Sequence, residues 1–332
     1  MAQRRVLSAL VGRANVALHR AHAQKSPIWL RSKATLPNSY RSLSSTSNSE
    51  KKQESQQRVT TTINSSNGIA HVKLNRPDKL NALDLAMFEA LAETAEQVAK
   101  DKSIRAVILS GEGRAFCTGL DVKAIAKGGS PIQTAKKLLA QRYVDDDQCI
   151  SNLAQDVGYL WRQVPSPVIA AIHGMCYGGG VQIALGADMR YCTPDCKLSI
   201  MEAKWGLIPD MSASVTLREL VPIDVAKELT YTGRVISGTE AAALHLVTRC
   251  VEHPLEEAEK VAAEIVNGNP DAVAAAKKMY QKNWIDATEK EALNREMELQ
   301  KTLLGSWNQM AAAVDNFGVK VPYLSRKEDK KE

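Results

Sequence analysis

The sequence of 332 residues lacks several features that would place it in a familiar class. It has no stretch of about 20 consecutive apolar residues, which a membrane-spanning helix needs, so we expect no membrane span. Its six cysteines form no CxxC pair and have no histidine partner at zinc spacing, so we predict reduced thiols and no metal site. It also contains neither GxGxxG nor GxxxxGK, the patterns of dinucleotide-binding and phosphate-binding loops.

Acidic residues are absent from the first 49 positions, which hold eight of the chain's 43 arginines and lysines. The remaining 35 basic residues face 37 acidic ones, so the basic surplus belongs to this leader and not to the rest of the chain. Binding to nucleic-acid phosphates needs clustered Lys and Arg. The charge balance therefore predicts no nucleic-acid partner.

The leader has the pattern of a mitochondrial transit peptide. It is rich in Arg and Ser, and its apolar positions lie at helical spacing opposite Arg4, Arg5 and Arg13. Such a segment predicts import into the mitochondrial matrix. The stretch that follows, residues 42–57, is rich in Ser, Asn and Gln and is typical of a disordered linker. We therefore predict that residues 1–57 lie outside the fold.

Strand and helix patterns alternate along the body of the chain, which predicts an α/β fold. Residues 59–63 and 69–74 flank an Asn-Gly turn, the pattern of a β-hairpin. An apolar helical face begins after Asp84, a suitable N-cap. Residues 105–110 and 167–172 read as buried strands.

After residue 253 the patterns are helical. We therefore divide the chain into the leader, a core at 58–253 and a C-terminal helical region at 254–332.

Each of the two buried strands leads into a segment that contains glycines. The first segment covers residues 113–121, and the second, residues 173–181, carries three consecutive glycines at the start of a predicted helix. Glycines there let a ligand approach the backbone, and the free N–H groups of a helix start favour negative charge. These segments can therefore stabilise an oxyanion, although tight packing of a helix on a strand would also explain the glycines.

Four segments give the chain a resemblance to the crotonase, or enoyl-CoA hydratase/isomerase, family over about residues 58–325. They are LNRPDKLNAL at 74–83, FCTGLDV at 116–122, the glycine segment that begins at His173, and ADMRY at 187–191. The resemblance implies an α/β, crotonase-like spiral of ββα turns with a C-terminal helical trimerisation region, assembled as a homotrimer or hexamer. It also implies an acyl-CoA substrate and no cofactor, because coenzyme A is part of the substrate.

The same resemblance assigns roles to individual residues. The backbone N–H groups of Leu120 and Gly179 would form an oxyanion hole for a thioester enolate. The substrate-binding residues would be Thr118, Gly119, Leu120, Asp121, Val122, Lys123 and Gly179.

The stretch 199–211 sets two carboxylates, Glu202 and Asp210, among apolar side chains. Gly206 and Pro209 disfavour a continuous helix, so we predict a loop. The apolar neighbours are Met201, Trp205, Leu207 and Met211. Partial desolvation by them would raise the pKa of both carboxyl groups toward the range useful for proton transfer. Capping a helix or pairing with a nearby basic side chain is the structural alternative.

Three acid positions separate the reactions of the family, and here they hold Gln182, Glu202 and Asp210. Family hydratases have acids at the first two positions, which hold and activate a water. Gln182 can position water or substrate but cannot accept a proton. The acid at Asp210 resembles the dienoyl-CoA isomerases, although these also carry an acid where Gln182 stands. On that pattern Asp210 would remove a proton at C2 and Glu202 would return one at C6.

The sequence therefore predicts an acyl-CoA isomerase of fatty-acid β-oxidation that shifts the double bonds of a dienoyl-CoA or enoyl-CoA. Two alternatives within the family stay open: a hydratase of 2-enoyl-CoA, or a simple enoyl-CoA isomerase that uses Glu202 alone. A third, of another class, is a non-catalytic or RNA-binding protein with this fold. Lys277, Lys278 and Lys282 form a small basic stripe, predicted as a solvated helix face or as a contact for coenzyme A phosphates.

Overall fold

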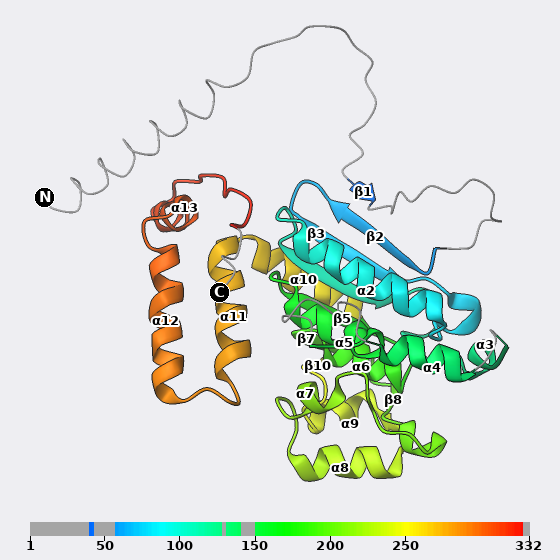
Figure 1. Ribbon diagram of the computed structural model, residues 1–332. Coiled ribbons are helices and arrows are strands. Elements are labelled where there is room, and N and C mark those ends of the chain that lie inside the picture. The colour runs from blue at the N-terminus through cyan, green and yellow to red at the C-terminus, as the bar shows by residue number, and fades with distance from the viewer. Residues whose placement is uncertain (1–39, 43–56, 128–130, 141–149, 328–332) are drawn as a thin grey trace, which may run out of the picture.

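A computed structural model describes residues 40–42, 57–127, 131–140 and 150–327 of the chain. Its main feature is a seven-stranded sheet in the order β1-β2-β3-β4-β5-β7-β10 (Figure 1). The strands are β1 (Tyr40–Ser42), β2 (Val59–Asn64), β3 (Ile69–Leu74), β4 (Ala106–Gly111), β5 (Val168–Ile172), β7 (Met189–Cys192) and β10 (Arg249–Cys250). Pairing is antiparallel from β1 to β3 and parallel from β3 to β10, so the carboxyl ends of the central strands meet at one edge.

A smaller three-stranded sheet has the order β6-β8-β9. Its strands are β6 (Met175–Tyr177), β8 (Lys197–Ser199) and β9 (Ile236–Ser237). The helices are α2 (Leu85–Lys100), α3 (Val122–Lys127), α4 (Pro131–Leu139), α5 (Leu153–Gln163), α6 (Gly179–Leu185), α7 (Ala213–Leu217), α8 (Ile223–Thr232), α9 (Gly238–Ala243), α10 (Pro254–Val266), α11 (Pro270–Asn283), α12 (Glu289–Leu303) and α13 (Trp307–Asp315). Two 3₁₀ turns are η1 (Pro77–Lys79) and η2 (Glu202–Trp205).

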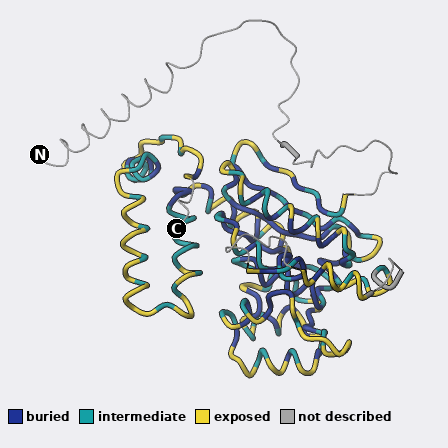
Figure 2. The backbone as a smooth tube through the Cα atoms, in the orientation of Figure 1, coloured by how far each residue is buried: buried dark blue, intermediate teal, exposed yellow. Residues whose placement is uncertain are grey.

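The central strands are buried on both faces, as expected where helices cover a parallel sheet. In β4, Val107 and Leu109 belong to the larger core, which α2 and α5 close. Ala106 and Ile108 point the other way and pack with Ala258 of α10. Figure 2 shows that the buried residues gather along the central strands, whereas exposed residues are frequent along the outer helices.

Local signals that the sequence predicted are present in the fold. The hairpin β2–β3 turns at Gly68, whose φ of 75° favours glycine. Asp84 caps α2 by accepting a hydrogen bond from the N–H of Met87 at 2.9 Å. These predictions are confirmed.

Two parts of the predicted division differ from the structure. Residues 40–42 form β1 and pair with β2, although they lie within the segment assigned to the leader. Helix α10 packs on the sheet and therefore belongs to the core, although the boundary at 254 assigned it to the C-terminal region. The transit-peptide prediction otherwise falls outside the described residues. Among the residues that the structure describes, no helix has the length and apolar character that crossing a bilayer requires.

Helices α11 to α13 stand beside the core (Figure 1). Helix α12 packs mainly on α11, and none of its residues is buried. The region therefore presents much of its surface to solvent in the single chain.

Candidate active site

The first glycine segment is held in place by the motif at 74–83. Asn81, fully buried, accepts a hydrogen bond from the N–H of Arg76 and donates to the carbonyl oxygens of Glu112 and Ala115. Leu83 then brackets Leu120: its N–H donates to the carbonyl of Gly119 at 2.8 Å, and its carbonyl accepts from Asp121 at 2.9 Å. These two hydrogen bonds engage the carbonyl of Gly119 and the N–H of Asp121, so the pairing does not use the N–H of Leu120 that lies between them.

The second glycine segment runs beside the first. The N–H of Cys117 donates to the carbonyl of Met175, and the N–H of Tyr177 donates to the carbonyl of Cys117 at 2.9 Å. Gly119 has a φ of 80°, and a Cβ there would lie 2.8 Å from the carbonyl oxygen of Tyr177 and 3.3 Å from the nitrogen of Gly179. Only glycine permits this approach, because a side chain would collide with the neighbouring backbone.

The N–H groups of Leu120 and Gly179 are thereby brought to one place at the carboxyl edge of the sheet. Neither donates a hydrogen bond to an acceptor in the described part of the chain. Gly179 is also the first residue of α6, where backbone N–H groups have no partner within the helix. The pair meets the chemical requirement of an oxyanion hole, which is uncommitted donors fixed in advance.

Glu202 lies next to this pair of donors, at the start of η2. A Cβ on Gly178 would be 3.2 Å from its Oε1. Its Oε2 is buried and has no hydrogen-bond partner in the described residues. Burial raises the pKa of Glu202, the hydrogen bond from Gln182 opposes this shift, and the negative charge of Asp210 adds to it. Glu202 is thus a carboxyl group that holds a proton more readily than an exposed glutamate.

Gln182 ties the two ends of the acid loop together. It is 1% exposed, its Nε2 donates to Glu202 Oε1 at 2.7 Å, and its Oε1 accepts from the N–H of Met211 at 2.8 Å. Both polar ends of the side chain are therefore committed to the loop 202–211. The amide commits Oε1 of Glu202 to a hydrogen bond and leaves Oε2, which has no partner among the described residues, as the oxygen that can carry a proton.

Asp210 lies on the wall of a cavity of about 790 Å³, which we call the Asp210 cavity. The residue is exposed as a whole, yet its carboxyl group is partly desolvated, which raises its pKa above the ordinary value. The cavity walls are mainly apolar and come from α5, residues 208–213, α7 and α8. They include Tyr159, Ile208, Ser212, Leu217 and Tyr231. The Oγ of Ser212 is buried with no partner among the described residues.

The predicted environment of the acid loop is partly wrong. The loop itself is present, since a 3₁₀ turn ends at Gly206 with a left-handed φ of 69°. Trp205 and Leu207, which the sequence predicted to desolvate the acids, are 63% and 57% exposed. Desolvation instead comes from residues distant in sequence, because Glu202 lies against Gln182 and Gly178.

The other predicted substrate-binding residues form the border of the first glycine segment. Thr118 donates its hydroxyl to the carbonyl of Leu80, and Gly119 is buried beside Gly179. The carboxylate of Asp121 is engaged, because it pairs with Arg76 at 2.7 Å and accepts from the N–H of Ala124. The side chains left exposed beside the segment are Leu120, Val122 and Lys123. Their contact with substrate stays a prediction.

The prediction for the basic stripe on α11 was wrong at Lys277, whereas Lys282 is exposed as predicted. The Nζ of Lys277 is buried and donates to Asp188 at 2.6 Å and to the carbonyl oxygens of Trp161 and Ser166. It is therefore neither a solvated group nor a contact for coenzyme A phosphates. It joins α11 to the end of α5 and to the start of β7.

Comparisons with known proteins identify the family to which the chain belongs. The family model described as enoyl-CoA hydratase/isomerase matches residues 64–317. The chain belongs to the enoyl-CoA hydratase/isomerase family. Its fold is the crotonase fold, an α/β architecture with a central sheet and C-terminal helices, as the sequence predicted.

Relatives within the enoyl-CoA hydratase/isomerase family include several isomerases. The chain is 34% identical to the mitochondrial Delta(3,5)-Delta(2,4)-dienoyl-CoA isomerase of Mus musculus over 63% of this chain, and the match spans 64% of that relative. It is 30% identical to the peroxisomal enzyme of that name from Arabidopsis thaliana, over 80% of this chain and 93% of the relative. A crystal structure of a putative enoyl-CoA hydratase from Streptomyces coelicolor A3(2) superimposes with a TM-score of 0.72 at 27% identity, covering 86% of this chain and all of that one.

Proposed function

We propose that the chain is an acyl-CoA isomerase that moves the double bonds of a dienoyl-CoA by proton transfer through an enolate. One observation carries the proposal: the acid loop offers two carboxyl groups of raised pKa beside two uncommitted backbone donors, while the first of the family's three acid positions holds Gln182. The similarity to dienoyl-CoA isomerases from two organisms supports the same reaction.

The proposed reaction converts a 3,5-dienoyl-CoA into a 2,4-dienoyl-CoA. Asp210, ionised, takes a proton from C2, and the electron pair left behind moves into an enolate whose oxygen is held by the N–H groups of Leu120 and Gly179. Glu202, protonated on Oε2, gives its proton to C6, and the conjugated system shifts by one carbon. Asp210 then releases its proton to solvent, and Glu202 takes up a proton from solvent, which restores both groups.

The pKa shifts of the two carboxyl groups support Asp210 as the base and Glu202 as the acid. The charge of Asp210 is one cause of the raised pKa of Glu202, whereas the pKa of Asp210 is raised by desolvation. When Asp210 is ionised, Glu202 is therefore favoured as the protonated partner. Pairs of carboxyl groups whose environments separate their pKa values are how acid and base roles are assigned in many enzymes.

Gln182 favours isomerisation over hydration. A water that adds to a double bond must lose a proton to an acceptor that can keep it. Gln182 cannot keep a proton, and its carbonyl oxygen already accepts from Met211. Glu202 alone would have to orient and deprotonate the water, whereas isomerisation needs only the two carboxyl groups that are present.

The Asp210 cavity suits the acyl chain. It opens beside the base, and its walls are mostly apolar. Burial of methylene groups there would contribute about 0.8 kcal/mol per group. We infer that the chain beyond the reacting carbons lies against α5, α7 and α8.

Two assays on the purified protein test the proposed function. With a 3,5-dienoyl-CoA, the absorbance of the conjugated 2,4-dienoyl thioester should increase with time. With a 2-enoyl-CoA and no dienoyl substrate, the absorbance of the enoyl thioester should stay nearly constant. Rapid loss of the enoyl absorbance with no change of the dienoyl substrate would overturn the isomerase and establish a hydratase. No turnover of either would support the non-catalytic alternative.

We also propose that α11 to α13 mediate association into trimers or hexamers. Apolar side chains on these helices are exposed in the single chain, among them Tyr280, Trp284, Leu293 and Met297. Exposed apolar patches of this kind mark interaction surfaces. Light scattering should give three or six chains per particle, and Trp284→Glu should reduce that number. A monomeric wild-type protein would contradict the proposal.

A further inference from the structure

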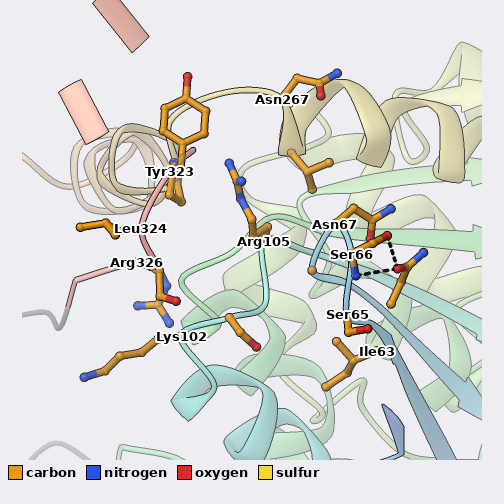
Figure 3. A pocket seen from close by; sticks show the side chains of 16 residues that line it. Ile63, Ser65, Ser66, Asn67, Lys102, Arg105, Asn267, Tyr323, Leu324 and Arg326 are labelled. Atoms are coloured by element: carbon orange, nitrogen blue, oxygen red, sulfur yellow. Dashed lines mark hydrogen bonds between the residues drawn. The ribbon is translucent and has the colours of Figure 1, made fainter. Parts of the chain in front are cut away.

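A second cavity, of about 550 Å³, lies away from the acid loop, and we call it the Arg105 cavity (Figure 3). Its walls are the loop of the β2–β3 hairpin at 64–68, the segment 102–105 that leads into β4, the junction of α10 and α11 at 266–270, and the C-terminal segment 323–326. These walls lie where β3 and β4 begin, whereas the two oxyanion donors follow strands β4 and β5 at their carboxyl ends. The two cavities share no lining residue.

The Arg105 cavity is positively charged. Among the described residues, three basic side chains line it, Lys102, Arg105 and Arg326, and none of the described lining residues is a carboxylate. Arg326 is 7% exposed and donates to the carbonyl of Ala99 at 3.1 Å. A cavity that gathers three cations from two separate segments of the chain concentrates anions from solution.

Arg105 is the central residue of this charge. Its Nη2 donates to the carbonyl of Gly268, and its guanidinium stacks 5.2 Å from the ring centre of Tyr323. Its Nε is buried with no hydrogen-bond partner, and in the described part of the chain no carboxylate forms an ion pair with it. Burial lowers the pKa of Arg105 because it removes water from the charged guanidinium.

Within the described residues, the contacts of the Arg105 guanidinium are with neutral groups. The Gly268 carbonyl and the Tyr323 ring hold the guanidinium in place but carry no full negative charge. Half-buried charges are costly unless a charge of opposite sign compensates them. The arrangement therefore fixes an arginine in one orientation and leaves its charge to be neutralised from outside the described residues.

The hairpin loop adds polar groups to the cavity wall. Within the loop, Asn64 Oδ1 accepts hydrogen bonds from both the N–H and the hydroxyl of Ser66 (Figure 3). Asn67 Oδ1 accepts from the N–H of Ile69, so the amide nitrogen of Asn67 is the end that can serve a ligand. The loop is also fixed to Arg105 itself, whose N–H donates to the carbonyl of Gly68 at 2.9 Å.

We propose that the Arg105 cavity is a second binding site, separate from the acyl-CoA site, for a small phosphate-bearing anion whose phosphate is bound by the guanidinium of Arg105. The planar guanidinium forms paired, charge-assisted hydrogen bonds with phosphate oxygens. The volume falls within the range of about 300–1,000 Å³ that is usual for small-molecule sites. Lys102, on the same segment as Arg105, and the hairpin loop line the rest of the site.

Calorimetric titration of the full-length protein with inorganic pyrophosphate tests the proposal. The wild type should bind with a saturable heat that weakens as salt rises, and Arg105→Gln should lower the affinity at least tenfold. Lys290→Gln, the same charge change on exposed α12, should leave it unchanged. Lys102→Gln, at an exposed position, should lower it several-fold and serves as a second test if Arg105→Gln unfolds.

Two further arms separate this site from the proposed activity. Saturating coenzyme A should leave pyrophosphate binding intact, and Arg105→Gln should retain acyl-CoA turnover. A parallel titration with ADP distinguishes a nucleotide, which would bind more tightly than pyrophosphate, from a site that reads phosphate alone. Absence of saturable binding, equal affinity in Arg105→Gln, or displacement by coenzyme A would overturn the proposal.

Discussion

Replacing Gln182 by leucine probes the acid loop most sharply. The change removes the donor to Glu202 Oε1 and the acceptor of the Met211 N–H while keeping a side chain of similar size. An unsatisfied buried N–H costs about 1–3 kcal/mol, and a lost hydrogen bond to a carboxylate costs a similar amount. Because the two losses share one loop and are not additive, we expect the free energy of unfolding to fall by about 3 kcal/mol near neutral pH.

The stability loss should depend on pH. The pKa of Glu202 is raised in the folded protein, and Gln182 limits that rise, so the leucine variant should have a still higher folded pKa. A carboxyl group with a raised folded pKa contributes stability below its unfolded value of about 4.3, and this is lost as pH rises through the folded pKa. The deficit of Gln182→Leu relative to wild type should therefore grow as the pH rises above about 4, while the part of the deficit that comes from the unpaired N–H of Met211 stays constant.

The pH profile of activity in Gln182→Leu should also change, because it depends on the same pKa of Glu202. If Glu202 acts as the proton donor, the alkaline limb of kcat/KM reports its ionisation. That limb should shift to higher pH in Gln182→Leu, with kcat reduced because the loop is less well fixed. Gln281→Leu is the matched control, because Gln281 donates to the carbonyl of Arg162 at 2.7 Å, away from the acid loop. An unmoved alkaline limb in Gln182→Leu, or an equal shift in the control, would refute the role assigned to Gln182.

Two further substitutions address the rest of the site. Asp210→Asn should lower the isomerase rate by at least about 10²-fold, because it removes the proposed base, and a rate near wild type in the absorbance assay would make Asp210 structural. Gly119→Ala should destabilise the protein by about 1–3 kcal/mol and reduce kcat, since its φ is 80° and the new methyl would meet the Tyr177 carbonyl; thermal unfolding and kinetics measure both, and normal values would contradict the close approach.

The parts of the fold that follow from local chemistry could be predicted from the sequence. A left-handed turn at Gly68 and a carboxylate cap at Asp84 depend on neighbours within a few positions. The four family segments also predicted where the backbone donors lie, because their spacing reflects successive strands and turns. The crotonase fold itself was predicted in this way and is confirmed by the comparisons.

Contacts between distant segments could not be predicted. Gln182 meets Glu202 and Met211 across 20 and 29 positions, and no pattern in the sequence indicates that both ends of its amide are used. Lys277 looked like part of an exposed stripe because its partner Asp188 is 89 positions away. Trp205 was expected to shield the acids on grounds of polarity alone, but the backbone directs it to solvent. Only the folded arrangement decides which neighbours desolvate a charge.

A crystal structure of the protein with a saturated acyl-CoA tests the central claim most directly. The account predicts that the thioester carbonyl oxygen lies about 2.7–3.1 Å from the backbone nitrogens of both Leu120 and Gly179, with the acyl chain directed past Asp210. A thioester oxygen that contacts neither nitrogen, or an acyl-CoA bound at another place on the protein, would contradict it.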